Sequence, residues 1–361
     1  MQMQVIEGKA RIEQGQGFYN PDAKTARDFG VMAGKVLRDE RQRPVDVADL
    51  FAGTGIRSIR YALEVGVSRL LVNEGNHNLL PLIEENLRAN SVNARVSAKE
   101  VIRLLAEIKV EERRFDLVDM DVFGSPAPFI DCVFGAVKFG GLVYFTSTDT
   151  RTACGRHPRA SIRNYGTFLP RCDFCHELGA RAVISVFAMA GARKGFISWP
   201  VFTLWDGRAL RICMRVIRGR AGFPVENLGY ILMRKDGEVQ ALGMGDGVDA
   251  AGHITGPVWT GPLHDAGFLA KMKEHCQAGS KIDRRISLMM EENLEPAWFF
   301  KTDTASKTVS CSTPGVEDVV ARLRKKGFQA AKTQFSPTGV RTTASYSEFV
   351  NTVKELGGRG V

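Results

Sequence analysis

Phe115-Asp116-Leu117-Val118-Asp119-Met120-Asp121-Val122-Phe123-Gly124-Ser125-Pro126 is the stretch that decides the fold. Its first half is apolar enough to predict a buried strand, and the Gly-Ser-Pro turn ends that strand just beyond Asp121 and Phe123. In open α/β sheets, ligands bind in the crevice outside the carboxyl ends of the strands. A carboxylate beside an aromatic ring at that place suits holding a flat nitrogenous base and activating its amino group. The simpler alternative is an ordinary strand end followed by a polar turn. The segments that precede this stretch decide between the two interpretations.

A glycine-containing loop follows an earlier predicted strand. Gly53 and Gly55 allow this loop to turn tightly and to approach a ligand closely. A second predicted strand, at 69–73, ends at Glu74, where doubly wound folds place the carboxylate that binds a ribose diol. The third glycine of a dinucleotide fingerprint is missing, and Asp49 at the head of the loop suits a cationic methionine group better than a pyrophosphate. The pattern therefore predicts S-adenosylmethionine, rather than NAD, as the cofactor.

Four further predicted strands complete the sheet. They are expected at residues 94–97, 141–146, 196–205 and 209–217. The last two face each other across Asp206-Gly207, a hairpin signal. A parallel sheet that finishes in an antiparallel hairpin is the arrangement of methyltransferases, so we expect an α/β fold with a class I, Rossmann-like, seven-stranded sheet. Glu100 follows the third strand, where an acid could accept the adenine amino hydrogen; a solvated glutamate at a helix start is an equal alternative.

Two basic groups favour contact with a polyanion, in keeping with a formal net charge of +9. The first follows the fifth predicted strand and comprises Arg151, Arg156, Arg159 and Arg163. Charge runs are usually solvated surface, but this one lies where a phosphodiester substrate would enter the crevice. The second lies on a predicted helix and in a predicted loop at 335–342, and comprises Arg324, Lys325, Lys326 and Arg341.

The length and composition predict two soluble domains. A chain of 361 residues is long for one core. An Arg-, Gly- and Pro-containing segment at 219–224 separates a first domain at 1–218, which includes an N-terminal lead-in, from a smaller α+β domain at 225–361. The chain contains no membrane-length apolar run and no signal-peptide pattern, so we expect a cytoplasmic protein without membrane contact.

Cysteine usage predicts reduced thiols and no metal. Only one pair among the seven cysteines, Cys172 and Cys175, has ligand-like spacing. A structural zinc site usually takes two such pairs, and the sequence offers no second pair.

Several short motifs follow one another along nearly the whole chain. In the first half they are Phe18-Tyr19-Asn20-Pro21 with Arg27, Thr54-Gly55-Ile56-Arg57, Asp119 to Pro126, and His157-Pro158-Arg159 with Arg163 and Tyr165. In the second half they are Cys175-His176-Glu177, Gly256-Pro257-Val258-Trp259, Gly261-Pro262-Leu263 and Phe335-Ser336-Pro337-Thr338-Gly339. With these motifs the chain resembles the tRNA guanine-26 N2-dimethyltransferase family in its compact archaeal-type form.

This resemblance implies an activity and residue roles. It implies N2-methylation of guanine in tRNA with S-adenosylmethionine, by a methyltransferase domain joined to a C-terminal domain that helps to bind tRNA. Asp121 corresponds to the family's catalytic carboxylate, and Phe18 and Phe123 to aromatics that clamp the flipped guanine. On its own segment alone, Phe18 would instead be taken as an aromatic that pins the lead-in to the core. The residues implied to hold the cofactor are Arg27, Arg57, Glu74 and Glu100.

The chain departs from the family pattern in three places. Val122 stands where the family usually has proline, Gln334 stands where it often has histidine, and the cysteine pairs of zinc-bearing relatives are missing. Two alternatives therefore stay open. One is an amino methyltransferase for another guanine, another RNA or a protein amide. The other is a degenerate homologue that only binds tRNA, which Val122 favours and the intact Asp121 and Glu74 oppose. We expect a monomer.

Overall fold

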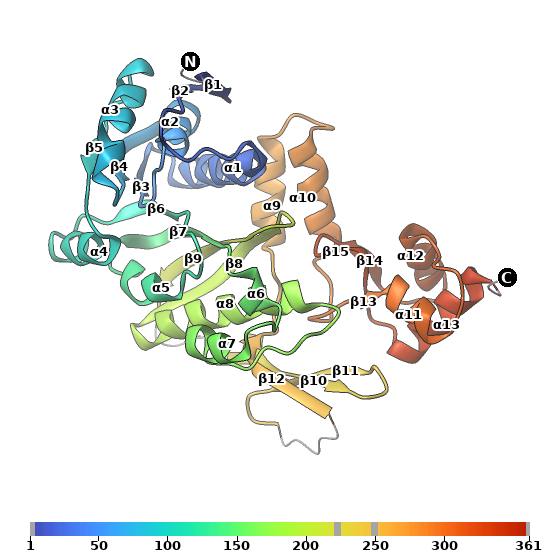
Figure 1. Cartoon of the computed structure of the whole chain (residues 1–361). Coiled ribbons are helices and arrows are strands. Elements are labelled where there is room, and N and C mark those ends of the chain that lie inside the picture. Colours follow the sequence, from blue (N-terminus) through green and yellow to red (C-terminus); the bar gives the residue numbers. More distant parts are fainter. Residues whose placement is uncertain (1–3, 220–224, 247–251, 359–361) are drawn as a thin grey trace.

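A seven-stranded sheet is the largest element of the computed structural model, which describes residues 4–219, 225–246 and 252–358 (Figure 1). Its strand order is β5-β4-β3-β6-β7-β9-β8; the first five strands are parallel, and β9 is antiparallel to both β7 and β8. The strands are β3 (Val45–Asp49), β4 (Val67–Asn73), β5 (Arg95–Ser97), β6 (Phe115–Met120), β7 (Val137–Ser147), β8 (Phe196–Trp205) and β9 (Leu210–Arg218). The expected α/β sheet with a terminal antiparallel hairpin is confirmed.

Helices cover both faces of this sheet, and each face has its own hydrophobic core (Figure 1). One face packs against α1 (Lys24–Arg41), α2 (Ile56–Tyr61) and α3 (Leu80–Ala89), and the other against α4 (Val101–Val110), α5 (Ala127–Val133) and α8 (Cys175–Arg193). Strand β6 contributes to both cores, because Leu117 packs on the α1 side whereas Val118 and Met120 pack on the α8 side. All of β6 is buried, as its near-continuous apolar run predicts for a central parallel strand.

The N-terminal lead-in crosses the carboxyl end of the sheet. It begins with a hairpin of β1 (Gln4–Glu7) and β2 (Ala10–Glu13) and reaches α1 through a short helical turn, η1 (Pro21–Ala23). A Cβ atom on Gly17 would lie 2.6 Å from Cγ2 of Thr54, so the backbone passes directly against the loop that follows β3. Two short helices, α6 (Thr150–Ala153) and α7 (Pro158–Tyr165), lie between β7 and α8.

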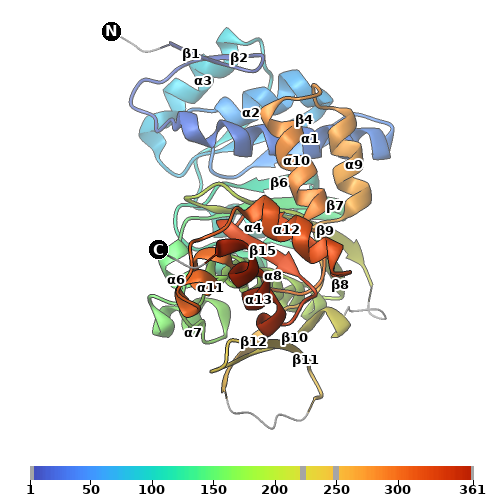
Figure 2. The same cartoon turned by 90° about the vertical axis from the view of Figure 1, so that its right-hand side faces the viewer.

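The chain after Val225 forms three pieces. Strands β10 (Leu228–Arg234), β11 (Val239–Gly243) and β12 (Gly252–Trp259) make a small antiparallel sheet whose β12 packs against α8. Helices α9 (Ala266–Glu274) and α10 (Lys281–Glu291) lie beside α1 (Figures 1 and 2). The third piece has a separate hydrophobic core and consists of β13 (Phe300–Lys301), α11 (Thr302–Thr308), α12 (Val316–Lys325), β14 (Ala330–Thr333), β15 (Ser336–Thr342) and α13 (Tyr346–Gly357).

Several elements of this second half are not predicted by the sequence. The letters Ser-Pro-Thr-Gly predict a loop at 335–342, and this is wrong: β15 occupies that segment and pairs with β13 and β14. Tertiary pairing there outweighs the turn propensity. The expected boundary at 219–224 lies almost wholly outside the described residues, so the division into 1–218 and 225–361 stays a prediction. No helix among the described ranges is long and apolar enough to cross a membrane.

Gln334 ties the third piece to the sheet. Its side-chain amide donates to the carbonyl oxygen of Thr203 at 2.9 Å and to the carboxylate of Glu292 at 2.6 Å. The backbone N–H of Trp205 donates to its side-chain oxygen at 2.9 Å. This buried glutamine, at a place where the family often has histidine, is therefore a structural bridge between β8 and the segment before β15.

Candidate active site

Asp121 directly follows β6, at the carboxyl end of the sheet, and 30% of its side chain is exposed. Because alternate residues of a strand point to the same face, Asp119 and Asp121 continue the line of Leu117 toward α2. Arg57, in the first turn of α2, contacts both carboxylates. Its Nη1 lies 3.1 Å from Oδ2 of Asp119, and its Nη2 lies 2.7 Å from Oδ2 of Asp121. The Asp-x-Asp spacing thus brings two carboxylates to one arginine.

The second oxygen of Asp121 is held from β7 and β9. Oγ1 of Thr146 and Nη1 of Arg211 each donate to its Oδ1 at 2.7 Å. Burial alone would raise the pKa of this carboxyl group, but the charges of Arg57 and Arg211 and the hydrogen bond from Thr146 outweigh burial and hold the pKa well below its usual range. Asp121 is therefore anionic at neutral pH, and it is a good hydrogen-bond acceptor but a weak base.

Two further carboxyl groups lie beneath this site. Burial raises the pKa of Asp119 to about 6, with the charges of Arg57 and Asp121 acting in opposite directions. Asp49 is fully buried and accepts a hydrogen bond of 2.6 Å from Oγ of Ser58, while burial and the charge of Asp119 raise its pKa to about 7. The structure therefore does not present Asp49 to a ligand. Its contacts hold α2 against β3, in place of the direct contact with a methionine group that the sequence suggested.

The side chain of Phe123 is 96% exposed on an anchored loop. Val122 packs into the core on the α8 side, and Gly124 exchanges hydrogen bonds of 2.6 and 2.9 Å with Thr148. These contacts fix the backbone at the position where the family usually has proline. Leaving a phenylalanine in water forgoes about 2 kcal/mol of burial free energy, which a ligand with a flat apolar face can recover.

Phe18 is the second exposed aromatic, at 81%. Its carbonyl oxygen lies 3.6 Å from the place that a Cβ atom on Gly53 would occupy, so it stands beside the glycine loop. The alternative role, pinning the lead-in to the core, belongs instead to its neighbour Tyr19. The hydroxyl of Tyr19 donates to Glu7 at 3.0 Å, and the guanidinium of Arg27 lies 5.0 Å from the centre of its ring.

Glu74 closes the glycine loop at the end of β4. Its carboxylate accepts hydrogen bonds from the N–H groups of Gly53 and Asn76, each at 2.9 Å. Gly53 and Gly55 have φ values of +57° and +80°, a left-handed conformation that favours glycine. The carboxylate thus lies next to the loop, where doubly wound folds bind a ribose diol.

Glu100 and Arg27 have partners inside the protein. Glu100 caps α4, accepting hydrogen bonds from the N–H groups of Ile102 and Arg103 at 3.0 and 2.9 Å, as the helix-start alternative predicts. Arg27 is buried and donates to Glu7 at 2.8 Å. The assignment of these two residues to the cofactor stays a prediction.

A pocket of about 660 Å³ opens beside Arg211, one of the two arginines that contact Asp121. Arg211 and Thr148 line it, together with the start of α1, the β8–β9 turn and the first turn of α10. Its wall carries charges of both signs, because Asp22, Asp28 and Asp206 line it together with Lys24, Arg208 and Lys281. Such a volume is typical of a site for a small organic group.

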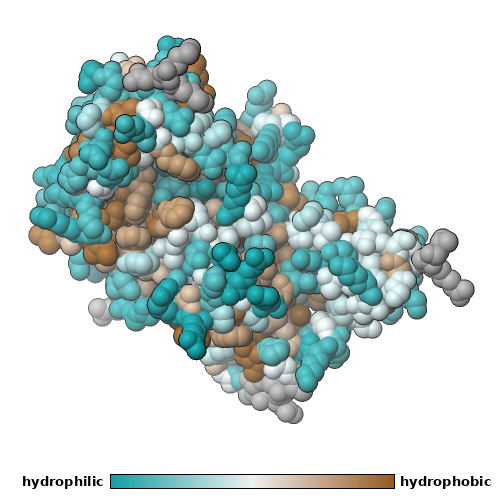
Figure 3. Space-filling view, in the orientation of Figure 1, coloured by the Kyte–Doolittle hydropathy of each residue, from teal (hydrophilic) through white to brown (hydrophobic). Residues whose placement is uncertain are grey.

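The expected RNA contacts divide into exposed and buried residues. Arg151, Arg156, Arg159 and Arg163 are all exposed on α6, α7 and the loop between them. Figure 3 shows hydrophilic residues gathered over this region. Arg324, Lys325 and Lys326 are exposed at the end of α12, in the third piece. Arg341 is only 1% exposed and donates to Glu177 at 2.7 Å, so it is a buried structural residue and not an RNA contact.

Thr146 and Arg211 are site residues that the sequence does not single out. They face each other in the β7–β9 pairing, and this places both beside Asp121. The order of strands in the sheet could reveal them. Thr146 is the last residue of the fifth predicted strand, and Arg211 comes just after the turn of the hairpin that pairs with this strand.

One known family matches almost the whole chain. Its model, described as N2,N2-dimethylguanosine tRNA methyltransferase, matches residues 2–354. The chain belongs to this family. The membership confirms the resemblance noted in the sequence and the expectation of a methyltransferase that modifies tRNA.

Relatives within the family match over at least nine tenths of each chain. The tRNA (guanine(26)-N(2))-dimethyltransferase of Pyrobaculum islandicum is 33% identical over 92% of this chain and 90% of its own length. The enzyme of the same name from Pyrococcus horikoshii is 29% identical over 98% of each chain. The solved structure of Trm1 from Pyrococcus horikoshii with S-adenosyl-L-methionine superposes with a TM-score of 0.86 at 27% identity, covering 97% of this chain and 99% of that one.

Proposed function

We propose that this enzyme transfers methyl groups from S-adenosylmethionine to the exocyclic N2 of guanine 26 in tRNA, giving N2,N2-dimethylguanine. The observation that carries the proposal is the anionic Asp121, clamped by Arg57 and Arg211 at the end of the central strand. The exposed Phe123 lies two residues further on, and Phe18 stands beside the glycine loop. The names of the relatives, and the cofactor in the Pyrococcus horikoshii structure, support the same reaction.

Asp121 activates the amino group as a hydrogen-bond acceptor. The lone pair of guanine N2 is delocalised into the ring, and an acceptor for one N–H favours the pyramidal nitrogen that can attack. Bound S-adenosylmethionine would supply the electrophilic methyl group, and breaking its S–CH3 bond would leave S-adenosylhomocysteine. Because the pKa of Asp121 is held low, its carboxylate orients the N–H bond without retaining the proton. N2 releases the proton to water once the N–C bond has formed and the nitrogen has become cationic. Each transfer replaces one N2 hydrogen, so a second transfer can use the other.

Phe18 and Phe123 hold the target base outside the RNA stack. A base inside folded tRNA must leave its stack to reach the methyl group, which costs a few kcal/mol. Stacking on aromatic side chains contributes about 1–3 kcal/mol per base and offsets this cost. Both phenylalanines are exposed before any ligand binds, so no core packing is lost when they contact the base.

The remaining roles follow the geometry around the loop. Glu74 binds the ribose hydroxyls of the cofactor, because its carboxylate lies beside the glycine loop. Arg57, Arg27 and Glu100 occupy the positions at which the resemblance implies cofactor contacts. The exposed arginines of α6, α7 and the loop between them, with Arg324, Lys325 and Lys326 at the end of α12, bind tRNA phosphates. We propose a monomer, because one chain carries every side chain that these steps use. We also propose that it acts in the cytoplasm, on the ground that its family modifies tRNA.

The two alternatives are weaker. A degenerate homologue that only binds tRNA rested on Val122, and this residue is packed in the core with its loop anchored to Thr148. Methylation of another guanine or another RNA uses the same side chains and differs only in the nucleotide presented.

Methyl transfer to unmodified tRNA transcripts tests the proposal. With labelled S-adenosylmethionine, nucleoside analysis should find N2-methylguanosine and then N2,N2-dimethylguanosine, and neither product when adenine replaces guanine 26. Methylation that persists in the adenine transcript contradicts the assigned position. Binding of tRNA and cofactor without transfer supports the binding-only homologue.

A further inference from the structure

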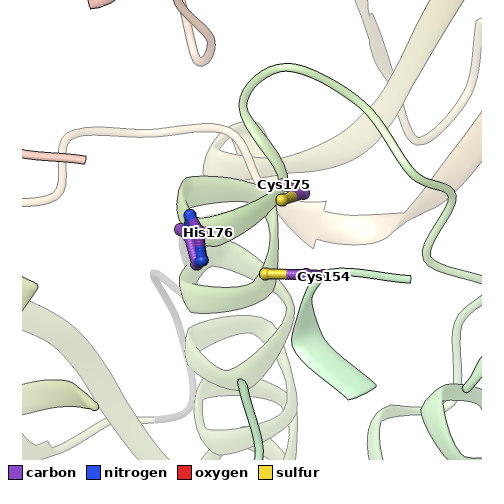
Figure 4. A group of neighbouring side chains, drawn as sticks. All are labelled: Cys154, Cys175 and His176. Atoms are coloured by element: carbon purple, nitrogen blue, oxygen red, sulfur yellow. The ribbon is translucent and has the colours of Figure 1, made fainter. Parts of the chain in front are cut away.

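Three potential metal ligands meet where α6 ends and α8 begins (Figure 4). Sγ of Cys154, Sγ of Cys175 and a ring nitrogen of His176 all lie within 4.8 Å of one another. Cys154 directly follows α6, and the other two are the first residues of α8. The cluster is mostly withdrawn from solvent, since Cys154 is buried and its partners are half-buried. None of these side chains takes part in the proposed methyl transfer.

Cys172 adds a fourth potential ligand. It forms a Cys-x-x-Cys turn with Cys175, whose backbone N–H donates to the carbonyl oxygen of Cys172 at 3.2 Å. This turn holds the backbones of the two cysteines together at the start of α8. The expectation of no metal rested on the absence of a second cysteine pair, and the fold instead completes the set with Cys154 and His176. A thiolate-rich set of four, containing one Cys-x-x-Cys turn, is a common composition of structural zinc sites.

The backbone is shaped to bring these residues together. A Cβ atom on Gly179 would lie 2.5 Å from Cβ of Ala153, so only glycine at that position of α8 lets the end of α6 approach so closely. The ring of His176 stacks on Trp205 with centroids 4.2 Å apart and an angle of 27°. Stacking uses the face of the imidazole and leaves the nitrogens at its edge available as ligands. The approach of the two helices and the orientation of the histidine are thus set by packing.

The surroundings suit an anionic metal centre. The charges of Lys301 and Arg156 lie near His176 and place positive charge beside the cluster. Three thiolates and one imidazole around a divalent ion carry a net charge of minus one. The two nearby cations balance that charge.

We propose that Cys154, Cys172, Cys175 and His176 bind a zinc ion in a tetrahedral structural site. Zn–S bonds of about 2.3 Å place tetrahedral sulfur ligands roughly 3.8 Å apart, so the separations of up to 4.8 Å among Cys154, Cys175 and His176 close with small side-chain rotations. Thiolates favour zinc over magnesium or calcium, which prefer oxygen ligands.

The ion fastens the arginine-bearing segment to the fold. Cys154 lies between Arg151 and Arg156, two of the residues proposed to bind tRNA phosphates, whereas the other three ligands precede or begin the long helix α8. Zinc would hold this segment in place before tRNA arrives. The binding of zinc itself does not depend on the proposed methyl transfer.

Metal content is the first test. The full chain, purified under a thiol-free reductant and without chelator, is expected to carry one zinc ion per chain by elemental analysis. Cys154→Ser and Cys175→Ser should each lose most of this zinc. Cys276→Ser is the matched control, because it removes a half-buried thiol at the end of α9, outside the cluster, and should retain the metal.

Cobalt titration of the metal-free wild-type chain gives a readout that requires no variant. One equivalent of Co²⁺ should produce thiolate-to-metal charge-transfer absorption and the visible bands of a tetrahedral site, and zinc should displace it. Zinc should also raise the melting temperature of the wild type and not that of Cys154→Ser. A reduced wild-type chain that binds neither ion stoichiometrically, or full zinc retention in Cys154→Ser, overturns the proposal. A Cys154–Cys175 disulfide in a chain that binds no metal overturns it as well and identifies a redox pair.

Discussion

The guanidinium of Arg211 lies 2.7 Å from the carboxylate of Asp121, although the two residues are 90 positions apart in the chain. Arg211 also contacts Asp206, in the turn between β8 and β9, at 3.2 Å. The terminal hairpin therefore does more than extend the sheet. It delivers the second of two arginines that keep Asp121 ionised, and Arg211 also lines the neighbouring pocket.

Loss of the charge on Asp121 should slow the chemical step. We expect Asp121→Asn, which keeps size and shape, to lower single-turnover methyl transfer by roughly 10²–10⁴-fold, with little change in binding of tRNA or cofactor. Asp131→Asn, at an exposed position of α5, is the control and should transfer at the wild-type rate. An Asp121→Asn variant that retained most of its rate would show that the central strand does not carry the chemistry.

The pH profile tests the clamp around the same carboxylate. The folded pKa of Asp121 is held below its usual range, so its negative charge is present above that pKa and is lost only in strong acid. As the pH falls from about 8 to about 5, the wild-type single-turnover rate should therefore show no loss from protonation of Asp121. Replacing Arg211 by Gln should weaken the clamp and move a loss of activity upward in pH. An unchanged profile in Arg211→Gln would contradict this role of Arg211.

The exposed phenylalanines should matter for transfer and not for stability. Phe123→Leu removes stacking worth about 1–3 kcal/mol, so we expect a loss of roughly 5- to 150-fold in transfer, and a similar loss for Phe18→Leu. Phe123→Tyr keeps an aromatic face and should stay near the wild type. Melting temperatures should not change, because both side chains are largely in solvent. Equal rates for Phe123→Leu and Phe123→Tyr would rule out stacking on this ring.

Local signals made the centre of the fold predictable. The apolar run of β6 is a single strand. The glycine loop and Glu74 belong to one strand–turn–helix–strand unit, so their relation can be read from spacing along the sequence. Residues that act through distant pairing were not predictable in this way. The buried position of Arg341 depends on β15 pairing with two strands, and the approach of Cys154 to Cys175 depends on the glycine in α8.

Removal of the charge on Glu74 should weaken cofactor binding specifically. Glu74→Gln keeps an acceptor for the N–H of Gly53 but loses charge-assisted hydrogen bonds to the ribose, which are worth about 1.5–3 kcal/mol. We expect calorimetry to find affinity for S-adenosylmethionine lowered by roughly 10- to 150-fold, with tRNA affinity unchanged. Glu85→Gln, on the outer side of α3, serves as the control. Wild-type affinity in Glu74→Gln would place the ribose elsewhere.

Replacing an exposed cation should alter tRNA binding and leave stability unchanged, whereas replacing a buried cation should do the opposite. Lys325 and Arg341 allow this comparison. Lys325→Met removes an exposed charge, so it should change the free energy of unfolding by less than about 0.5 kcal/mol and flatten the salt dependence of tRNA affinity by roughly one unit. Arg341→Met deprives Glu177 and the carbonyl oxygen of Trp298 of a buried donor, so it should cost about 3 kcal/mol or more. Its salt slope should equal that of the wild type.

The salt dependence of tRNA affinity also tests the exposed arginines of α7 and the loop before it. The double variant Arg156→Gln/Arg159→Gln should flatten the slope of log affinity against log salt by roughly two units, because each exposed arginine neutralises one phosphate. Arg95→Gln/Arg113→Gln removes the same charge near the amino ends of β5 and β6, the opposite edge of the sheet, and should leave the slope unchanged. Equal slopes in the two double variants would mean that only overall charge attracts tRNA. A wild-type slope for Arg156→Gln/Arg159→Gln would remove α7 and the preceding loop from the RNA contact.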